Sequence, residues 1–143
     1  MSGEKAVEAS ERLRTDARQL AERTTHLVRP SSSDQILNHL LDTQRSILEA
    51  LRDLAEWHRR TIPGVHFAEH HDESADGVSV VVEQLDLAAQ QAEGLQETLS
   101  RAYGASSVVR WFDEEQESPD HPVFPLNTPE GDAPAPRTGG SSR

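Results

Sequence analysis

The residues with the most evident chemistry lie together between His66 and Ser74, in the stretch HFAEHHDES. The stretch contains three of the seven histidines of the chain, His66, His70 and His71, and three acidic residues. Imidazole nitrogens and carboxylate oxygens are ligands of Zn²⁺ and Ni²⁺. Histidine also changes its charge near neutral pH. The stretch therefore allows a metal site or a pH-sensitive loop, beside the simpler interpretation as a solvated polar loop.

The first five letters, HFAEH, match the spacing H-x-x-E-H of one class of zinc metalloprotease. In those enzymes the motif lies on a helix, which places both histidines on one face. Here the motif follows Pro63 and Gly64, which end helices, so we expect a connecting loop. The chain is also too short for such an enzyme. We expect no cofactor, and keep as weak candidate metal ligands His66, His70 and His71, with Glu69 or Asp72.

Other catalytic arrangements have no support in the sequence. The chain has no cysteine, which excludes a thiolate nucleophile and a disulfide framework. It contains neither a G-x-S-x-G elbow nor a glycine-rich phosphate loop. We therefore expect a protein that is not an enzyme.

Composition narrows the classes of partner. The formal net charge is −11 and no basic stripe is present, so nucleic-acid binding is not expected. No apolar run is long enough for a membrane span and no signal peptide opens the chain, so we expect a cytoplasmic protein. Arginine supplies nearly all the positive charge and alanine is frequent, a composition typical of GC-rich bacterial genomes. Only 34% of residues are hydrophobic, which predicts a thin helical core.

Two long amphipathic segments should form an antiparallel helical hairpin. The first runs from Ser33 to Arg60, after the cap candidates Ser31, Ser32 and Ser33, and the second from about Gly77 to Tyr103, before Gly104. The β-branched start of the second segment, VSVVVEQL, also fits a strand, but its helical spacing continues for three more turns. Matching the two patterns places Ile47 opposite Ala92 and Leu51 opposite Ala88, large against small.

A weaker amphipathic helix precedes the hairpin, in residues 1–29. Its large apolar anchors are Leu13, Leu20 and Leu27, too few to hold one helix firmly. We expect it to complete a small three-helix bundle or coiled coil by loose contact with Leu41 and Leu48. Opening that contact would expose a leucine groove for a second copy or a helical partner.

The end of the chain divides into an apolar clasp and an acidic tail. Trp111 and Phe112 belong to an apolar cluster that should fold back onto the bundle end, which closes a hairpin region over residues 30–112. Residues 113–143 are rich in Pro, Gly and acids and should be disordered, with HPVFPL as a candidate linear motif.

The expected function is that of a non-catalytic helical module for protein–protein interaction or assembly. The expected partner is another protein or a second copy of the chain, which would give a homodimer. Its candidate interaction residues are Leu13, Leu20, Leu27, Leu41, Leu48, Trp111 and Phe112. Two alternatives stay open: an acidic regulator that covers a basic surface of a nucleic-acid-binding protein, and a small protein that binds metal through its histidine loop.

Overall fold

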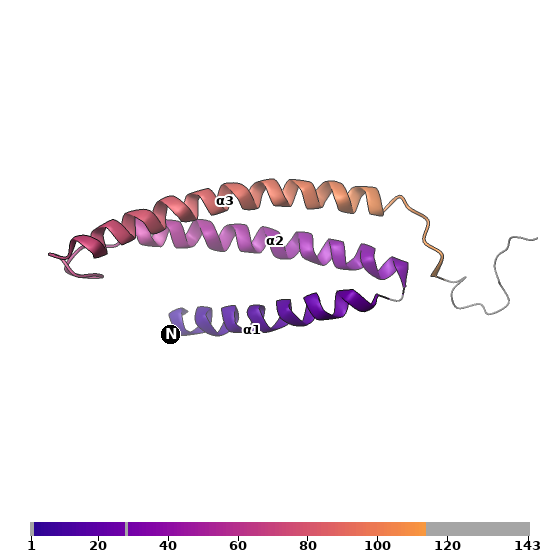
Figure 1. Cartoon of the computed structure of the whole chain (residues 1–143), viewed down its shortest axis with the longest axis horizontal. Coiled ribbons are helices and arrows are strands. Elements are labelled where there is room, and N and C mark those ends of the chain that lie inside the picture. Colours follow the sequence, from indigo (N-terminus) through magenta and orange to yellow (C-terminus); the bar gives the residue numbers. More distant parts are fainter. Residues whose placement is uncertain (1, 28, 114–143) are drawn as a thin grey trace, which may run out of the picture. The chain divides into compact units, whose positions relative to one another are not determined.

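A computed structural model describes residues 2–27 and 29–113, and within these ranges the regular elements are helices joined by short non-helical segments (Figure 1). Helix α1 spans Ser2–Arg23 and continues into a short 3-10 helix, Thr24–His26. Helix α2 spans Pro30–Arg59 and helix α3 spans Asp72–Ser106. The expected all-α class is therefore confirmed. The expected disordered tail and its HPVFPL motif lie outside the described residues, apart from Asp113.

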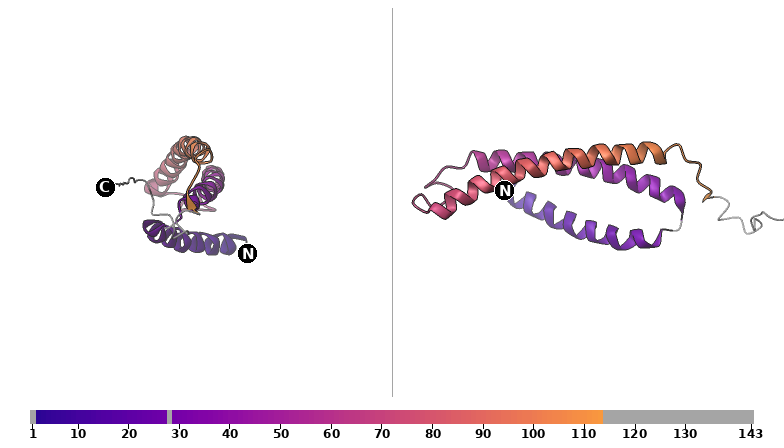
Figure 2. Two further views of the ribbon diagram at one scale, coloured as in Figure 1. Left: turned by 90° about the vertical axis from the view of Figure 1, so that its right-hand side faces the viewer. Right: turned by 45° about the horizontal axis from the view of Figure 1, so that its top comes forward.

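The described residues belong to two compact units. One contains α1, the start of α2 and residues 110–113, and the other contains residues 34–109. The second unit is the antiparallel hairpin of α2 and α3, which lie side by side in both views of Figure 2. That a third helix completes this hairpin stays a prediction.

The core of the hairpin is a narrow seam. Leu48, Ala89 and Ala92 form one buried cluster, against which Leu51 packs. On α2 the buried and half-buried positions recur in steps of four and three, as in a coiled coil, at Leu37, Leu41, Gln44, Leu48, Leu51, Ala55 and His58. Buried Gln44 uses its Nε2 to donate a hydrogen bond of 3.3 Å to the Ala92 carbonyl oxygen. A polar residue in the seam favours one register over its alternatives.

This seam corrects the expected pairing of the helices. Leu48, and not Ile47, packs with Ala92, while Leu54 is 49% exposed. Ala55, one position further on, is the most deeply buried of the core residues, at 1% exposure. Because the two rows of α2 repeat every seven residues and differ by one position, the hydrophobic pattern alone does not separate them.

Both hairpin helices begin earlier than the sequence predicts. Helix α2 starts at Pro30, a residue favoured in the first turn because its missing N–H has no helical partner there. The cap candidates Ser31, Ser32 and Ser33 thus lie inside the helix. Helix α3 starts at Asp72 instead of Gly77, because His71 caps it, and it continues through Gly104 to Ser106.

Helix α1 is shorter than expected, since its α-helical part ends at Arg23. The hydroxyl groups of Thr24 and Thr25 donate hydrogen bonds to the carbonyl oxygens of Ala21 and Glu22, at 3.1 and 2.8 Å. Such side-chain bonds compete with the helical backbone, and β-branched residues lower helix propensity further. The chain therefore tightens into a 3-10 turn.

The start of α2 receives a capping group from far along the chain. The carboxylate of Asp113 accepts hydrogen bonds from the Ser31 hydroxyl group and, at 3.1 Å, from the Ser31 backbone N–H. The hydroxyl bond is the main reason that the pKa of Asp113 is lowered from its ordinary value. The first turn of α2 has no acidic residue of its own. Asp113 therefore supplies the negative charge that a helix N-terminus favours.

The apolar cluster after α3 is less buried than expected. Backbone hydrogen bonds from Val108 to Ala105 and from Val109 to Ser106 form a turn. Val108 is nevertheless 80% exposed and Phe112 is 64% exposed, while Trp111 is 40% exposed. The turn is present, and the folding of Trp111 and Phe112 back onto the bundle end stays a prediction.

Candidate functional site

The two flanks of the hairpin seam differ in charge. We call the first the charged flank; its basic residues, Arg45, Arg52 and Arg59, recur every seven positions on α2. The side chain of Arg52 lies 2.5 Å from Glu93, and that of Arg59 lies 2.7 Å from Asp86, both across the seam. The hydrogen bond with Asp86, followed by one with Glu56, raises the pKa of Arg59 above its ordinary value. Arg52 and Arg59 are thus each matched by an acid of α3.

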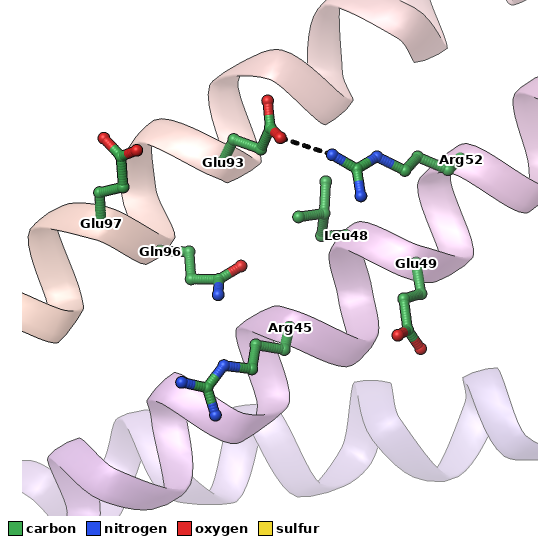
Figure 3. Close-up of a pocket in the computed structure, with 7 residues that line it drawn as sticks. All are labelled: Arg45, Leu48, Glu49, Arg52, Glu93, Gln96 and Glu97. Carbon is green, nitrogen blue, oxygen red and sulfur yellow. Dashed lines mark hydrogen bonds and ion pairs between the residues drawn. The ribbon is translucent and has the colours of Figure 1, made fainter.

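A shallow hollow of about 390 Å³ lies on the charged flank (Figure 3). The ion pair of Arg52 and Glu93 crosses it beside Leu48, and Arg45 and Gln96 also line it. The paired side chains of Arg52 and Glu93 are each more than half exposed, so water screens their attraction. These charges favour one register of the hairpin and add little to its stability.

The opposite side, which we call the uncharged flank, lies next to the seam and faces away from the arginines. It consists of one row of positions on α2 and one row on α3. Its residues on α2 are Ile36, Leu40, Thr43, Ile47, Ala50, Leu54 and Trp57. Its residues on α3 are Gly77, Val81, Gln84, Ala88, Gln91, Leu95, Thr98, Ala102 and Ala105. No residue of either row carries an ionisable group, in a chain of which 27% is charged.

The centre of the uncharged flank is apolar and partly open to solvent. Leu54 and Leu95 are each 49% exposed, and Val81 is 37% exposed. Leu40 and Ile47 are half-buried at the edge of the seam. Apolar residues at heptad spacing beside a coiled-coil seam are the positions that a third or fourth helix covers in a bundle. The flank thus combines apolar side chains at this spacing with partial exposure to solvent.

Two of the three candidate histidine ligands in the loop, His66 and His71, accept hydrogen bonds from backbone N–H groups. Nδ1 of His66 accepts a hydrogen bond of 2.9 Å from the Ile62 backbone N–H. Nδ1 of His71 accepts one of 3.2 Å from the Ser74 backbone N–H, which caps α3. His70 is exposed and lies 4.0 Å from Glu69. Within the part of the chain that the structure describes, no three histidine or acidic side chains form a group that could hold a metal ion.

A second hollow, of about 440 Å³, lies where the loop meets the helices, and it is lined by Pro63 and Phe67 of the loop and by Val78 and Val82 of α3. The loop itself is fixed by Gly64, whose φ of 82° is a conformation that glycine adopts without strain. The Gly64 N–H donates a 2.8 Å hydrogen bond to the Phe67 carbonyl oxygen.

The five leucines among the predicted interaction residues divide into two groups. Leu13 and Leu27 are 44% and 46% exposed, and Leu20 is half-buried. Leu41 and Leu48 are buried at 5% and 6% exposure, and Leu48 belongs to the hairpin seam. The surplus apolar row of α2 is therefore Leu40, Ile47 and Leu54. The charge pattern on the other side of the seam is the signal that identifies this row.

Comparison with protein-family models, with curated proteins and with solved structures finds no match for this chain. No helix within residues 2–27 and 29–113 is long and apolar enough to cross a bilayer. The functional argument therefore depends on the geometry of the hairpin itself.

Proposed function

We propose that the protein is a cytoplasmic, non-catalytic helical module that binds other helices through its uncharged flank. The observation that supports this proposal most is the separation of charge between the two flanks. A solvated helical hairpin gains solubility from charge on all its outer faces, and here both helices lack charge on the same side. Two aligned uncharged rows on α2 and α3 favour a surface that another molecule covers.

The spacing and size of the apolar side chains on the uncharged flank indicate what kind of helix could bind there. Leu40, Ile47 and Leu54 follow one another every seven residues, so a matching helix needs apolar residues at spacings of three and four. The α3 side is smaller, with Ala88 and Ala102, which lets a helix approach closely. A partner helix would therefore lie along these rows, in contact with both α2 and α3.

Two neighbouring glutamines provide a matched test of this proposal. Gln91 lies on the uncharged flank, whereas Gln90 lies toward the charged side of α3, and both are exposed. A photoreactive benzophenone side chain is placed at one position or the other in the full chain, which is then irradiated in an extract of the cells that produce it. We expect protein adducts from position 91 and few from position 90, because only the first lies beside the docked helix.

The mass of the adduct identifies the partner. Equal adducts at both positions, or none at 91, would contradict the proposal. Adducts mainly at 90, lost as salt is raised, would favour the alternative of an acidic regulator on a basic surface, because ion pairs are screened by salt.

A further inference from the structure

We infer that the partner on the uncharged flank is a second copy of this chain, so that two hairpins pack flank to flank as a four-helix bundle. This inference depends on the proposed function and names its partner. Its basis is self-complementarity: a two-fold symmetric interface brings the same patch of both copies together, so the patch must tolerate itself.

Charge selects the uncharged flank for this role. The chain has a formal net charge of −11, so two copies repel each other over most of their surface. The charged flank opposes its own acids, such as Glu49, Glu93 and Glu97, if it meets a copy of itself. The uncharged flank meets its copy without any like-charge contact, because none of its residues is ionisable.

Side-chain size is also complementary between copies. The α2 row is large, with Leu40, Ile47 and Leu54, and the α3 row contains small residues, with Ala88 and Ala102. When α2 of each copy lies against α3 of the other, large residues meet small ones, which fills a helical interface closely. Leu95 and Val81 then fill the spaces between the α2 side chains of the other copy.

The size of the flank sets the expected strength of the dimer. From Ile36 to Trp57 the flank is about 30 Å long at 1.5 Å per residue. Two helices side by side make it about 20 Å wide, or about 600 Å² on each copy. The total of about 1,200 Å² is at the lower limit of specific interfaces. The dimer should therefore be reversible, with a dissociation constant in the micromolar range.

Sedimentation equilibrium of the purified full chain over a wide concentration range tests the inference. We expect a monomer–dimer equilibrium. Leu95→Glu should leave a monomer, because it places charges from both copies in the interface. Gln91→Glu should weaken the dimer about tenfold, whereas its matched control Gln90→Glu should change the dissociation constant less than about twofold. Circular dichroism checks that each variant keeps its helices.

Two results would overturn the inference. One is a chain that stays monomeric to millimolar concentration, and the other is a dimer weakened equally by Gln91→Glu and Gln90→Glu. If the purified chain is monomeric but position 91 gives adducts with a different protein in extract, the second-copy inference fails and the proposed function stands. If position 91 gives no adduct and the chain is monomeric, both fail.

Discussion

Leu48→Asp is expected to unfold the hairpin of α2 and α3. Leu48 is 6% exposed and packs against Ala89 and Ala92 in the only cluster of buried residues that the described structure contains. The nearby basic residues, Arg45 and Arg52, are more than half exposed and already pair with Asp42 and Glu93, so a buried carboxylate at position 48 has no partner of its own. A buried charge without a partner costs about 3–5 kcal/mol, a large part of the stability of a small domain. Thermal and urea unfolding, followed by circular dichroism, measure the loss.

Leu54→Asp provides the matched control for this change. It is the same substitution on the same helix, but Leu54 is 49% exposed and lies on the uncharged flank. In solution too dilute for the proposed dimer to form, we expect a loss of about 1 kcal/mol or less, as for surface substitutions. Equal losses for the two variants would mean that Leu48 does not occupy the seam.

Ala92→Leu is expected to destabilise the hairpin by about 1–3 kcal/mol through overpacking. Ala92 is 6% exposed and lies against Leu48, so a larger side chain forces the helices apart. Adding Leu48→Ala should recover part of the loss, because the exchange restores the total volume of the layer. Ala102→Leu, at an exposed position of the same helix, should have little effect on the monomer.

Denaturant unfolding of the four chains in this cycle measures the coupling between the two positions. A favourable coupling between Leu48→Ala and Ala92→Leu supports the observed packing. Purely additive losses, with recovery from Ile47→Ala instead, would place Ile47 opposite Ala92.

The existence and direction of the hairpin helices could be predicted from the sequence. The apolar spacing from Leu37 onward and the break at Pro63 and Gly64 are local signals that later packing does not override. Which row faces inward could not be chosen from apolar residues alone. Leu54 is more hydrophobic than Ala55, yet Ala55 is the buried one, because closely packed helices need a small residue at their contact.

The charges contain the information that the apolar pattern lacks. Arginines at 45, 52 and 59 and acids at 86 and 93 share the seven-residue repeat, and pairing them across the seam determines its orientation. The uncharged flank then follows as the side opposite to these pairs. The same reasoning places Leu48 in the hairpin seam, while the expected contact of Leu41 and Leu48 with the helix of residues 1–29 stays a prediction.

The capping groups of α2 and α3 could not be predicted from the local sequence, for two different reasons. His71 caps α3 through its ring nitrogen, although Ser, Thr, Asp and Asn are the usual capping residues. Ser31 and Asp113 are separated by 82 positions, and nothing near either residue indicates the other. Long-range contacts of this kind arise from the tertiary structure and leave no periodic signal.

The register of the hairpin decides which side chains form the uncharged flank, and disulfide trapping measures it most directly. The chain has no cysteine, so each introduced pair is the only pair present. Disulfide formation requires Cβ atoms within about 4.5 Å, which the helices approach only at facing positions. Under mild oxidation we expect Leu48→Cys with Ala92→Cys to crosslink faster than Ile47→Cys with Ala92→Cys. Faster crosslinking of the pair at 47 and 92 would show that Ile47, and not Leu48, lies in the seam, and would contradict the assignment of the uncharged flank.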